Sequence, residues 1–417
     1  MPRKPPRPYV VRPETAVLTR GFDPRLSVGS ARPAVFRSST YVFTSPEAAA
    51  RAFDVALGRA RPAPDESIDL IYSRLSHPNA EILEDQIVPL ERGATAAAVF
   101  NSGMAAISTV CLALCRPGQA IVHSAPLYGG TALLLDAVLA PLGVRTVAVD
   151  AGDTEGMRRA IADTDDVALV FIETPANPTL RMTDIAAAVE AAAARDPRPV
   201  VAVDNTFLGP AFQHPLALGA DLAVYSATKY LAGFSDMLGG VVLAKERDLV
   251  DALRGLRALL GNILQPDECW LLDNRLVTVP LRMNRQSKNA QRIAEGISGH
   301  PAVARIWYPT LFDDPEQRRI YEAQCDYPGA IVTLELHGGR PAAFTFLRTL
   351  RIAKNAVSLG GVESLACHPR TTTHSELPPE QLDALGISEG MVRISVGVEN
   401  WRDLLADLRR ALDAAAP

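Results

Sequence analysis

Short apolar runs alternate with helical patterns through the middle of this chain, and this alternation constrains its fold more than any other feature. Parallel strands are buried on both faces and joined by helices, so they read as continuous apolar runs separated by helical segments. The pattern therefore predicts an α/β domain with one mostly parallel, seven-stranded sheet. The predicted strands are 96–100, 120–124, 144–150, 167–173, 199–204, 222–226 and 239–244, with helices predicted at 105–115, 131–142, 154–163 and 184–195.

The flanking segments divide the chain further. Residues 1–70 are predicted to form an N-terminal arm and loop, with an extended Pro- and Arg-rich arm over 1–30 that lies on a partner subunit and a polar loop over 58–69. Residues 71–265 would form the large domain, and 266–417 a connecting helix with a smaller α+β C-terminal domain. Outside the central region, helices are predicted at 247–262, 266–299, 342–350 and 401–415, and strands at 303–308, 330–336, 352–359 and 391–398.

Charge and cysteine content narrow the class of function. The chain has 417 residues and a formal net charge of −5, so it offers no basic field for nucleic acid. Its apolar stretches are too short to span a membrane, and its basic, Pro-rich start is not followed by the apolar segment of a signal peptide. Five scattered cysteines do not make a disulfide framework, which favours a reduced, cytoplasmic protein. Cys111 and Cys115 share a helix face without further ligands nearby, so we interpret them as packing residues and predict no metal site.

The segment Ser226–Gly240, SATKYLAGFSDMLGG, places Lys229 just past a predicted strand and among small residues. A partly desolvated lysine has a lowered pKa and can form a Schiff base. The hydroxyls of Ser226 and Thr228 are suited to hold a phosphate. Alone, this pattern is more typical of a surface lysine at a strand-to-loop junction. The interpretation of Lys229 as a Schiff-base lysine is favoured only because other segments complete the same site.

Other strand ends carry matching groups. In NSGMAAIS, Gly103 and Met104 open a helix whose free N–H groups suit an anion. Asp204 ends a buried strand, where a carboxylate needs a partner such as a pyridinium nitrogen, although in isolation a turn or capping aspartate is the favoured interpretation. Tyr128 in PLYGGT would stack on a planar cofactor or pack in the core, and Asn177 in ETPANPT would reach a ring hydroxyl.

Two arginines are candidates for anion binding. Tyr72 and Arg74 lie in YSR, where the guanidinium suits a phosphate unless it is a solvated surface charge. Arg393 lies in the apolar strand MVRISVG and Ser358 in the Gly-bounded loop AVSLGG. A buried arginine needs an anion, and either a substrate carboxylate or a structural salt bridge would serve.

Together these motifs resemble the Cys/Met-metabolism family of pyridoxal-phosphate enzymes, which includes cystathionine γ-synthase, cystathionine γ-lyase, O-acylhomoserine sulfhydrylase and methionine γ-lyase. YSR, SGMAAI, PLYGGT, ETPANP, VDNTF, SATKY, AVSLGG and VRISVG occur in the family's order from about Tyr72 to the C-terminus. The resemblance implies the fold type I architecture of pyridoxal-phosphate-dependent transferases, with Lys229 bound covalently to pyridoxal 5'-phosphate.

The resemblance also implies the remaining roles. The phosphate would contact Gly103, Met104, Ser226 and Thr228 of one subunit and Tyr72 and Arg74 of its neighbour, so that the site needs a homodimer, and the family's usual assembly is a homotetramer. Tyr128 would stack on the ring and move protons, and Asp204 would pair with the ring nitrogen. The ring oxygen would contact Asn177, which with Ser358 and Arg393 would also bind a small amino-acid substrate.

We expect a γ-elimination lyase that acts on a γ-substituted L-amino acid such as methionine, homocysteine or canavanine and releases a 2-oxo acid and ammonia. The alternative is γ-replacement, as in cystathionine γ-synthase or O-acylhomoserine sulfhydrylase. Two departures from the family pattern bear on this choice. His77-Pro78-Asn79 replaces the usual Asn-Pro-Thr, and we interpret His77 as structural or solvated rather than catalytic. Gly130 stands where methionine γ-lyases commonly carry a cysteine, which weakens methionine as the specific substrate.

Overall fold

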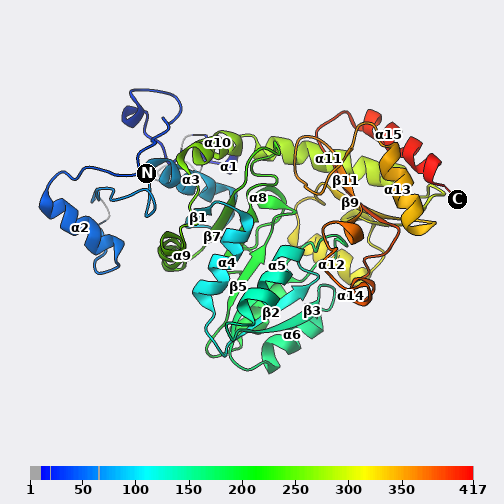
Figure 1. Ribbon diagram of the computed structural model, residues 1–417, viewed down its shortest axis with the longest axis horizontal. Helices are drawn as coiled ribbons and strands as arrows, with labels where there is room; N and C mark the ends of the chain where they lie inside the picture. Colours follow the sequence, from blue (N-terminus) through cyan, green and yellow to red (C-terminus); the bar gives the residue numbers. More distant parts are fainter. Residues whose placement is uncertain (1–10, 19, 64–65, 417) are drawn as a thin grey trace, which may run out of the picture.

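The computed structural model describes residues 11–18, 20–63 and 66–416, and two β-sheets joined by long helices make up most of it (Figure 1). The larger sheet lies in the centre of the molecule and the smaller one near the C-terminus. The boundaries predicted after residues 70 and 265 stay predictions.

The larger sheet has seven strands in the order β1-β7-β6-β5-β4-β2-β3. Strands β6, β5, β4, β2 and β3 run parallel, whereas β7 pairs antiparallel with both β6 and β1. The predicted α/β fold with a mostly parallel seven-stranded sheet is therefore confirmed. The strands are β1 (Ala96–Phe100), β2 (Ala120–Ala125), β3 (Arg145–Asp150), β4 (Val167–Glu173), β5 (Val200–Asp204), β6 (Leu222–Ser226) and β7 (Gly240–Ala244).

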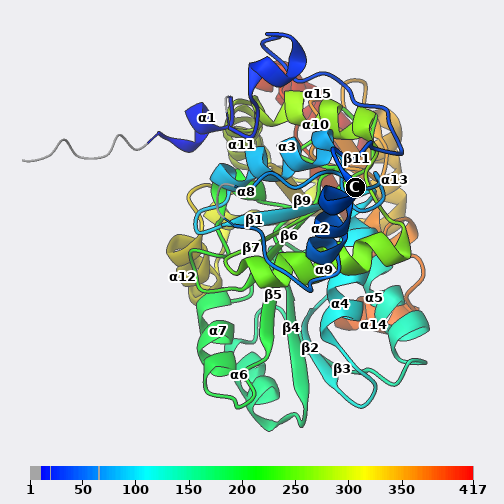
Figure 2. The same cartoon turned by 90° about the vertical axis from the view of Figure 1, so that its left-hand side faces the viewer.

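Helices cover both faces of this sheet because alternate residues of each buried strand point to opposite sides. In β4, Leu169 and Phe171 pack in one core cluster, and Val170 and Ile172 pack in another. Figure 2 shows the sheet between the helix pair α6 and α7 and the pair α4 and α5. The helices of this region are α3 (Pro78–Ile87), α4 (Gly103–Leu114), α5 (Gly129–Leu134), α6 (Thr154–Asp163), α7 (Ile185–Ala193), α8 (Gly209–Phe212) and α9 (Arg247–Leu260).

Parallel strand direction brings polar residues together at one edge of the sheet. Glu173 at the end of β4 is in register with Asp204 at the end of β5, and Asp204 is in register with Val224 of β6. The chain leaves β6 at Ser226 and reaches Lys229 three residues later. The carboxyl ends of three neighbouring strands thus meet, as is typical of ligand sites in open α/β sheets.

The second sheet has five strands in the order β10-β11-β12-β9-β8, mostly antiparallel. Helices α13 and α15 pack against each other at the end of the molecule that carries the C-terminus (Figure 1). The elements are β8 (Val303–Trp307), α12 (Pro315–Gln324), β9 (Ile331–Leu336), α13 (Gly339–Thr349), β10 (Lys354–Asn355), β11 (Leu365–Cys367), α14 (Pro379–Ala384), β12 (Met391–Ser395) and α15 (Trp401–Ala415).

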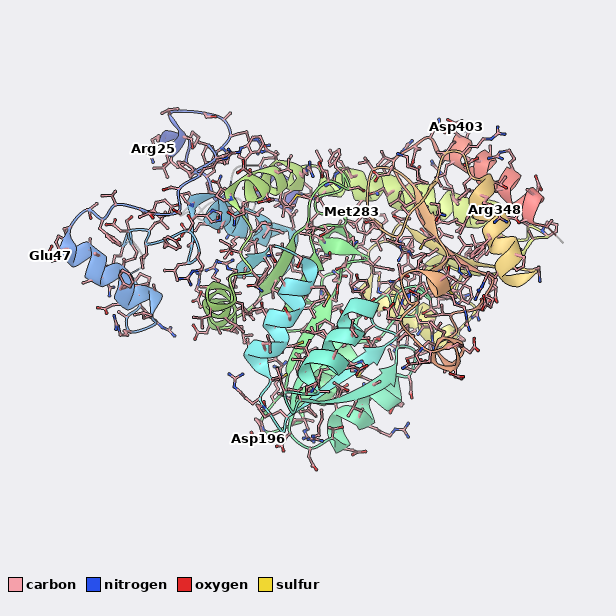
Figure 3. All side chains as sticks on the ribbon, viewed as in Figure 1. Arg25, Glu47, Asp196, Met283, Arg348 and Asp403 are labelled. Carbon is pink, nitrogen blue, oxygen red and sulfur yellow. The ribbon has the colours of Figure 1, made fainter. Side chains whose placement is uncertain are left out.

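The single helix predicted over 266–299 is wrong, because this segment forms two helices, α10 (Pro266–Leu276) and α11 (Val279–Ile297). Pro280 has no N–H to donate and is tolerated in the first turn of α11, so a new helix starts where the prediction ran on. Met283 of α11, labelled in Figure 3, packs close to Gly209 of α8. The apolar run 352–359, predicted as a strand, pairs only at Lys354 and Asn355, and the residues after them are free to line a cavity.

Part of the N-terminal segment, including α2 (Pro46–Ala56), extends away from the rest of the molecule, and Glu47 of α2 lies at the opposite end from Arg348 and Asp403 (Figures 1 and 3). Helix α1 (Pro13–Ala16) instead packs against the 3-10 helix Val88–Leu90, and Val17 is buried in the core. The extended arm predicted for 1–30 carries α1 and the short 3-10 helix Pro24–Ser27 in its described part, and residues 1–10 lie outside the described residues. Within the described ranges, no helix combines the length and apolar character needed to cross a membrane.

Candidate active site

A cavity of about 490 Å³ opens at the carboxyl ends of β4, β5 and β6. It brings together all the predicted site residues except Tyr72 and Arg74, although they come from segments between residues 103 and 393. Those residues are Gly103, Met104, Tyr128, Asn177, Asp204, Ser226, Thr228, Lys229, Ser358 and Arg393.

Lys229 lies in a turn that follows β6. Its N–H donates to the carbonyl of Ser226, and Thr228 exchanges hydrogen bonds with Gly239 across the turn. The Lys229 ammonium donates to Ser358 Oγ at 3.3 Å. Burial, with the nearby positive charge of Arg393, lowers the pKa of Lys229 to about 8, so far more of it is a neutral, nucleophilic amine near neutral pH than of an exposed lysine.

Close backbone packing holds this lysine turn in place. A methyl group on Gly360 would lie 2.7 Å from the Tyr230 backbone nitrogen and 3.0 Å from the Lys229 carbonyl carbon. Gly360 also has a φ of +78°, which favours glycine over other residues. The loop that carries Ser358 therefore rests directly on the backbone of Lys229.

The start of α4 forms an open cradle for an anion. A methyl group on Gly103 would lie 2.7 Å from Ser226 Cβ, so only glycine lets the helix approach this strand end. Ser102 caps the helix by accepting from the N–H of Ala105, and the N–H groups of Gly103 and Met104 have no acceptor among the residues that the structure describes. Free N–H groups at the positive end of a helix dipole are a favourable phosphate site.

Two buried carboxylates lie side by side on the cavity floor. Asp204 Oδ1 accepts from the N–H and hydroxyl of Thr206, at 3.0 and 2.6 Å. Glu173 accepts from the N–H groups of Tyr128 at 2.7 Å and Asn177 at 3.3 Å. Burial raises the pKa of both acids, and the adjacent Asp204 also contributes to raising the pKa of Glu173, to about 8. A cationic group beside Asp204 would offset the cost of burying its charge.

Arg393 is 2% exposed and has no carboxylate partner in the described part of the chain. Its guanidinium donates to Asn177 Oδ1 at 2.9 Å and to the carbonyls of Val357 at 2.6 Å and Ser358 at 3.2 Å. Its buried Nε has no acceptor. The structural salt bridge considered above is therefore not formed by the described residues, and a carboxylate ligand would satisfy the remaining donor.

Tyr128 stands at the cavity mouth, immediately before α5, with 44% of its surface exposed. Gly130 leaves little room here, since a methyl group on it would lie 2.7 Å from the Tyr128 ring and 3.1 Å from the Met104 sulfur. A cysteine at this position would require both side chains to move. In this chain the tyrosine ring and the methionine take that space.

Tyr72 and Arg74 lie outside this cavity. Arg74 donates to the carbonyl of Ala258 at 2.7 Å and lies over the Tyr72 ring, which is 42% exposed. His77 is buried and structural: its Nδ1 accepts from the N–H of Ala80 at the start of α3, and its Nε2 bonds the Leu264 carbonyl. Asn79 bonds the backbone of Ala34 and Phe36, so the altered tripeptide connects α3 to the N-terminal segment.

The sequence interpretation missed Glu173, Thr206 and Glu376, which also line the cavity. Glu173 ends the apolar run of β4 just as Asp204 ends that of β5, so the same argument would have identified it. Thr206 follows Asp204 by two residues, a spacing typical of an aspartate turn. Glu376 lies in a loop with no pattern to mark it.

These features together fit pyridoxal phosphate. The free N–H groups at the start of α4 beside Ser226 suit its phosphate, and the buried carboxylates suit its ring nitrogen. The amine of Lys229, with a single hydroxyl partner, suits its aldehyde. The unpaired Nε of Arg393 remains for an amino-acid carboxylate.

Comparisons with known proteins agree with this geometry. The family model for Cys/Met metabolism PLP-dependent enzymes matches residues 14–413. The L-methionine γ-lyase of Pseudomonas putida is 39% identical over 404 residues, covering 96% of this chain and 97% of that protein. The cystathionine β-lyase of Bacillus subtilis is 39% identical over 346 residues, covering 83% and 87%. The crystal structure of cystathionine γ-synthase from Xanthomonas oryzae pv. oryzae, in complex with aminoacrylate and cysteine, matches with a TM-score of 0.88 and 33% identity, covering 98% and 99%.

Proposed function

Because the chain belongs to the Cys/Met metabolism family of pyridoxal-phosphate-dependent enzymes, we propose that it is a γ-lyase that cleaves L-methionine and related γ-substituted L-amino acids. For a thioether substrate, water and the amino acid yield a thiol, 2-oxobutanoate and ammonia. The bond broken is the one between Cγ and sulfur.

One observation supports this proposal most directly: a lysine with a pKa of about 8 and an arginine with a free buried donor share one cavity and are linked by Ser358. Ser358 accepts from Lys229 through its hydroxyl and from Arg393 through its carbonyl. A substrate α-carboxylate bound by Arg393 therefore has its Cα near the amine that must remove its proton.

The cavity residues would have separate roles in cofactor binding and proton transfer. Gly103, Met104, Ser226 and Thr228 would hold the cofactor phosphate, and Asp204 the ring nitrogen. Bound pyridoxal phosphate supplies an electron-withdrawing ring that accepts the electron pair left at the substrate Cα. Lys229, once released by the substrate amine, would take the Cα proton and later return protons to the product.

Tyr128 and Asn177 would position the reacting groups. The ring of Tyr128 would stack over the cofactor, and its hydroxyl would move a proton at the cavity mouth. Asn177 uses its oxygen to orient Arg393, while its Nδ2 has no acceptor among the described side chains and backbone groups and would contact the ring oxygen.

γ-Replacement remains the second candidate, because the solved cystathionine γ-synthase has the same fold over 98% of this chain. Both reactions begin with the same deprotonation at Cα, and they differ in whether water completes the turnover or a nucleophile such as cysteine or sulfide adds at Cγ.

A homodimer is part of the proposal. Tyr72 and Arg74 do not reach the cavity of their own chain, and Tyr72 is exposed. The protruding N-terminal segment exposes apolar side chains, including Val42, Phe53 and Leu57. Covering these groups with a second copy would bury apolar surface and would bring the partner's Arg74 to the phosphate end of the cavity. A tetramer built from two such dimers is the expected assembly.

The test of γ-elimination is 2-oxobutanoate release by the cofactor-loaded enzyme. We expect keto acid from methionine, homocysteine, canavanine or another member of this class without any added thiol. Cystathionine and O-acetyl- and O-succinylhomoserine, each with and without cysteine, complete the panel. Consumption of an acylhomoserine only when thiol is present, with little keto acid alone, would instead establish γ-replacement.

The lowered pKa of Lys229 predicts the pH dependence of cofactor loading. Only the neutral amine attacks the aldehyde, so the loading rate of the apoenzyme should rise about tenfold per pH unit below pH 8 and level off above it. Stopped-flow absorbance would follow the reaction. Replacing Arg393 with methionine removes a nearby cation and should move the midpoint to higher pH. A rate that keeps rising toward pH 10 in the wild-type protein would contradict the assigned environment.

A further inference from the structure

A third carboxylate lines the cavity, and the γ-elimination chemistry leaves it without a role. Glu376 lies in the loop between β11 and α14 and is exposed at the cavity mouth. The other two carboxylates, Glu173 and Asp204, are buried on the cavity floor. Across the described residues, Glu376 has neither an ion-pair partner nor a hydrogen-bond donor.

The absence of a side chain on Gly129 leaves room for the Glu376 carboxylate. The Glu376 carboxylate lies so close to the Gly129 backbone that a methyl group on Gly129 would collide with it. Gly129 directly follows Tyr128, so the carboxylate lies beside the residue expected to stack on the cofactor. No N–H of α5 donates to Glu376, so it is not capping that short helix, and its charge is left for water or a ligand.

The same loop also reaches the opposite end of the site. His374, two residues before Glu376, is fully buried, and burial together with Arg393 lowers its pKa to about 4. It is therefore neutral at pH 7 and adds no charge. The loop thus extends from the vicinity of Arg393 to Gly129, the residue after Tyr128.

The mouth also has an apolar wall. Leu238 and Val357 line the cavity while 64% and 54% of their surfaces are exposed. Exposed apolar side chains at a cavity mouth favour contact with an alkyl or thioether chain. Together with Glu376, which lines the same cavity, they present the surface expected for an unbranched apolar chain that ends in a positive charge.

We propose that Glu376 selects γ-substituted amino acids whose leaving group carries a positive charge, such as aminoalkyl thioethers of homocysteine. This inference rests on the proposed γ-elimination. For S-(2-aminoethyl)-L-homocysteine, the Cγ–S bond breaks and the sulfur leaves with its electron pair as 2-aminoethanethiol once protonated. Water releases the remaining four-carbon unit as 2-oxobutanoate and ammonia, and no oxidant or reductant is consumed.

A matched pair of substrates tests the proposal in the holoenzyme. S-(2-aminoethyl)-L-homocysteine and S-propyl-L-homocysteine have side chains of nearly equal length and differ in charge. We expect the wild-type kcat/KM, measured by 2-oxobutanoate release, to favour the cationic substrate by about fivefold to tenfold, as for a partly desolvated ion pair. Glu376→Gln should bring the ratio close to one, and Glu376→Lys should invert it.

The ratio within one variant is insensitive to the amount of folded enzyme, so a loss of stability does not imitate the effect. Glu380→Gln is the matched control, because Glu380 is exposed four residues further along and does not line the cavity. It should keep the wild-type ratio. A wild-type ratio near one, or a preference that survives Glu376→Gln, overturns the role of Glu376 while leaving the γ-lyase in place. Absence of keto acid from both thioethers and from methionine overturns the proposed function itself.

Discussion

Replacing Lys229 with alanine is expected to lower 2-oxobutanoate release by about 10⁴-fold, because one change removes both the covalent attachment of the cofactor and the base that moves the Cα proton. Few nearby groups can replace it. Among the residues that the structure describes, the Lys229 ammonium bonds only Ser358 Oγ, and the burial that lowers its pKa to about 8 limits its contact with water. Steady-state assays of the cofactor-loaded variant give the rate. Its absorbance should shift to that of free pyridoxal phosphate, because no covalent bond to the protein forms.

Two variants separate chemistry from folding. Lys288→Ala removes an exposed lysine of α11 outside the cavity and should keep both the rate and the spectrum. Lys229→Arg retains a positive charge yet cannot form the covalent bond, so it should be as inactive as the alanine variant. A fully active Lys229→Ala enzyme with an unchanged circular dichroism spectrum would contradict the whole assignment of the site.

The architecture could be predicted from the sequence because the large sheet is buried on both faces. Its apolar runs must be continuous, and all seven predicted strands agree with the structure to within one residue at each end. The fold class, the family, the cofactor and the enzyme class inferred from the motifs are confirmed. The γ-lyase interpretation agrees with relatives of that name at 36–39% identity.

The sequence-based predictions failed or were incomplete where contacts between distant segments, rather than the local residue pattern, determine the structure. Helical periodicity continues across Thr278 although the chain turns there between α10 and α11. Glu173 ends an apolar run as Asp204 does and could have been identified on the same ground, but only the register of β4 and β5 shows that the two acids lie side by side. The location of Glu376 depends on how a loop folds over Gly129, which no spacing in the sequence encodes.

The pair of buried acids leads to the second large prediction. Asp204→Asn should reduce kcat by about 10²- to 10³-fold, the usual cost of removing one oriented electrostatic partner from an active site. Asparagine keeps an oxygen that accepts from the N–H and hydroxyl of Thr206, so the turn survives while the negative charge is lost. Without that charge the ring nitrogen is less often protonated, and the electron pair left at Cα is less well stabilised. Stopped-flow kinetics would locate the defect in the proton-transfer step rather than in substrate binding.

Glu173→Gln is the informative contrast to Asp204→Asn. With a pKa raised to about 8 by burial and by Asp204, Glu173 is largely neutral at pH 7, so a neutral amide leaves the net charge near the ring nitrogen almost unchanged. Glutamine has one acceptor oxygen for the two N–H groups of Tyr128 and Asn177, and the lost hydrogen bond should lower kcat by no more than about tenfold. If both substitutions reduced kcat equally, the two carboxylates would share the ring nitrogen. If Asp204→Asn left kcat unchanged while Glu173→Gln lowered it, Glu173 would be the partner of the ring nitrogen, and the role assigned to Asp204 would be wrong.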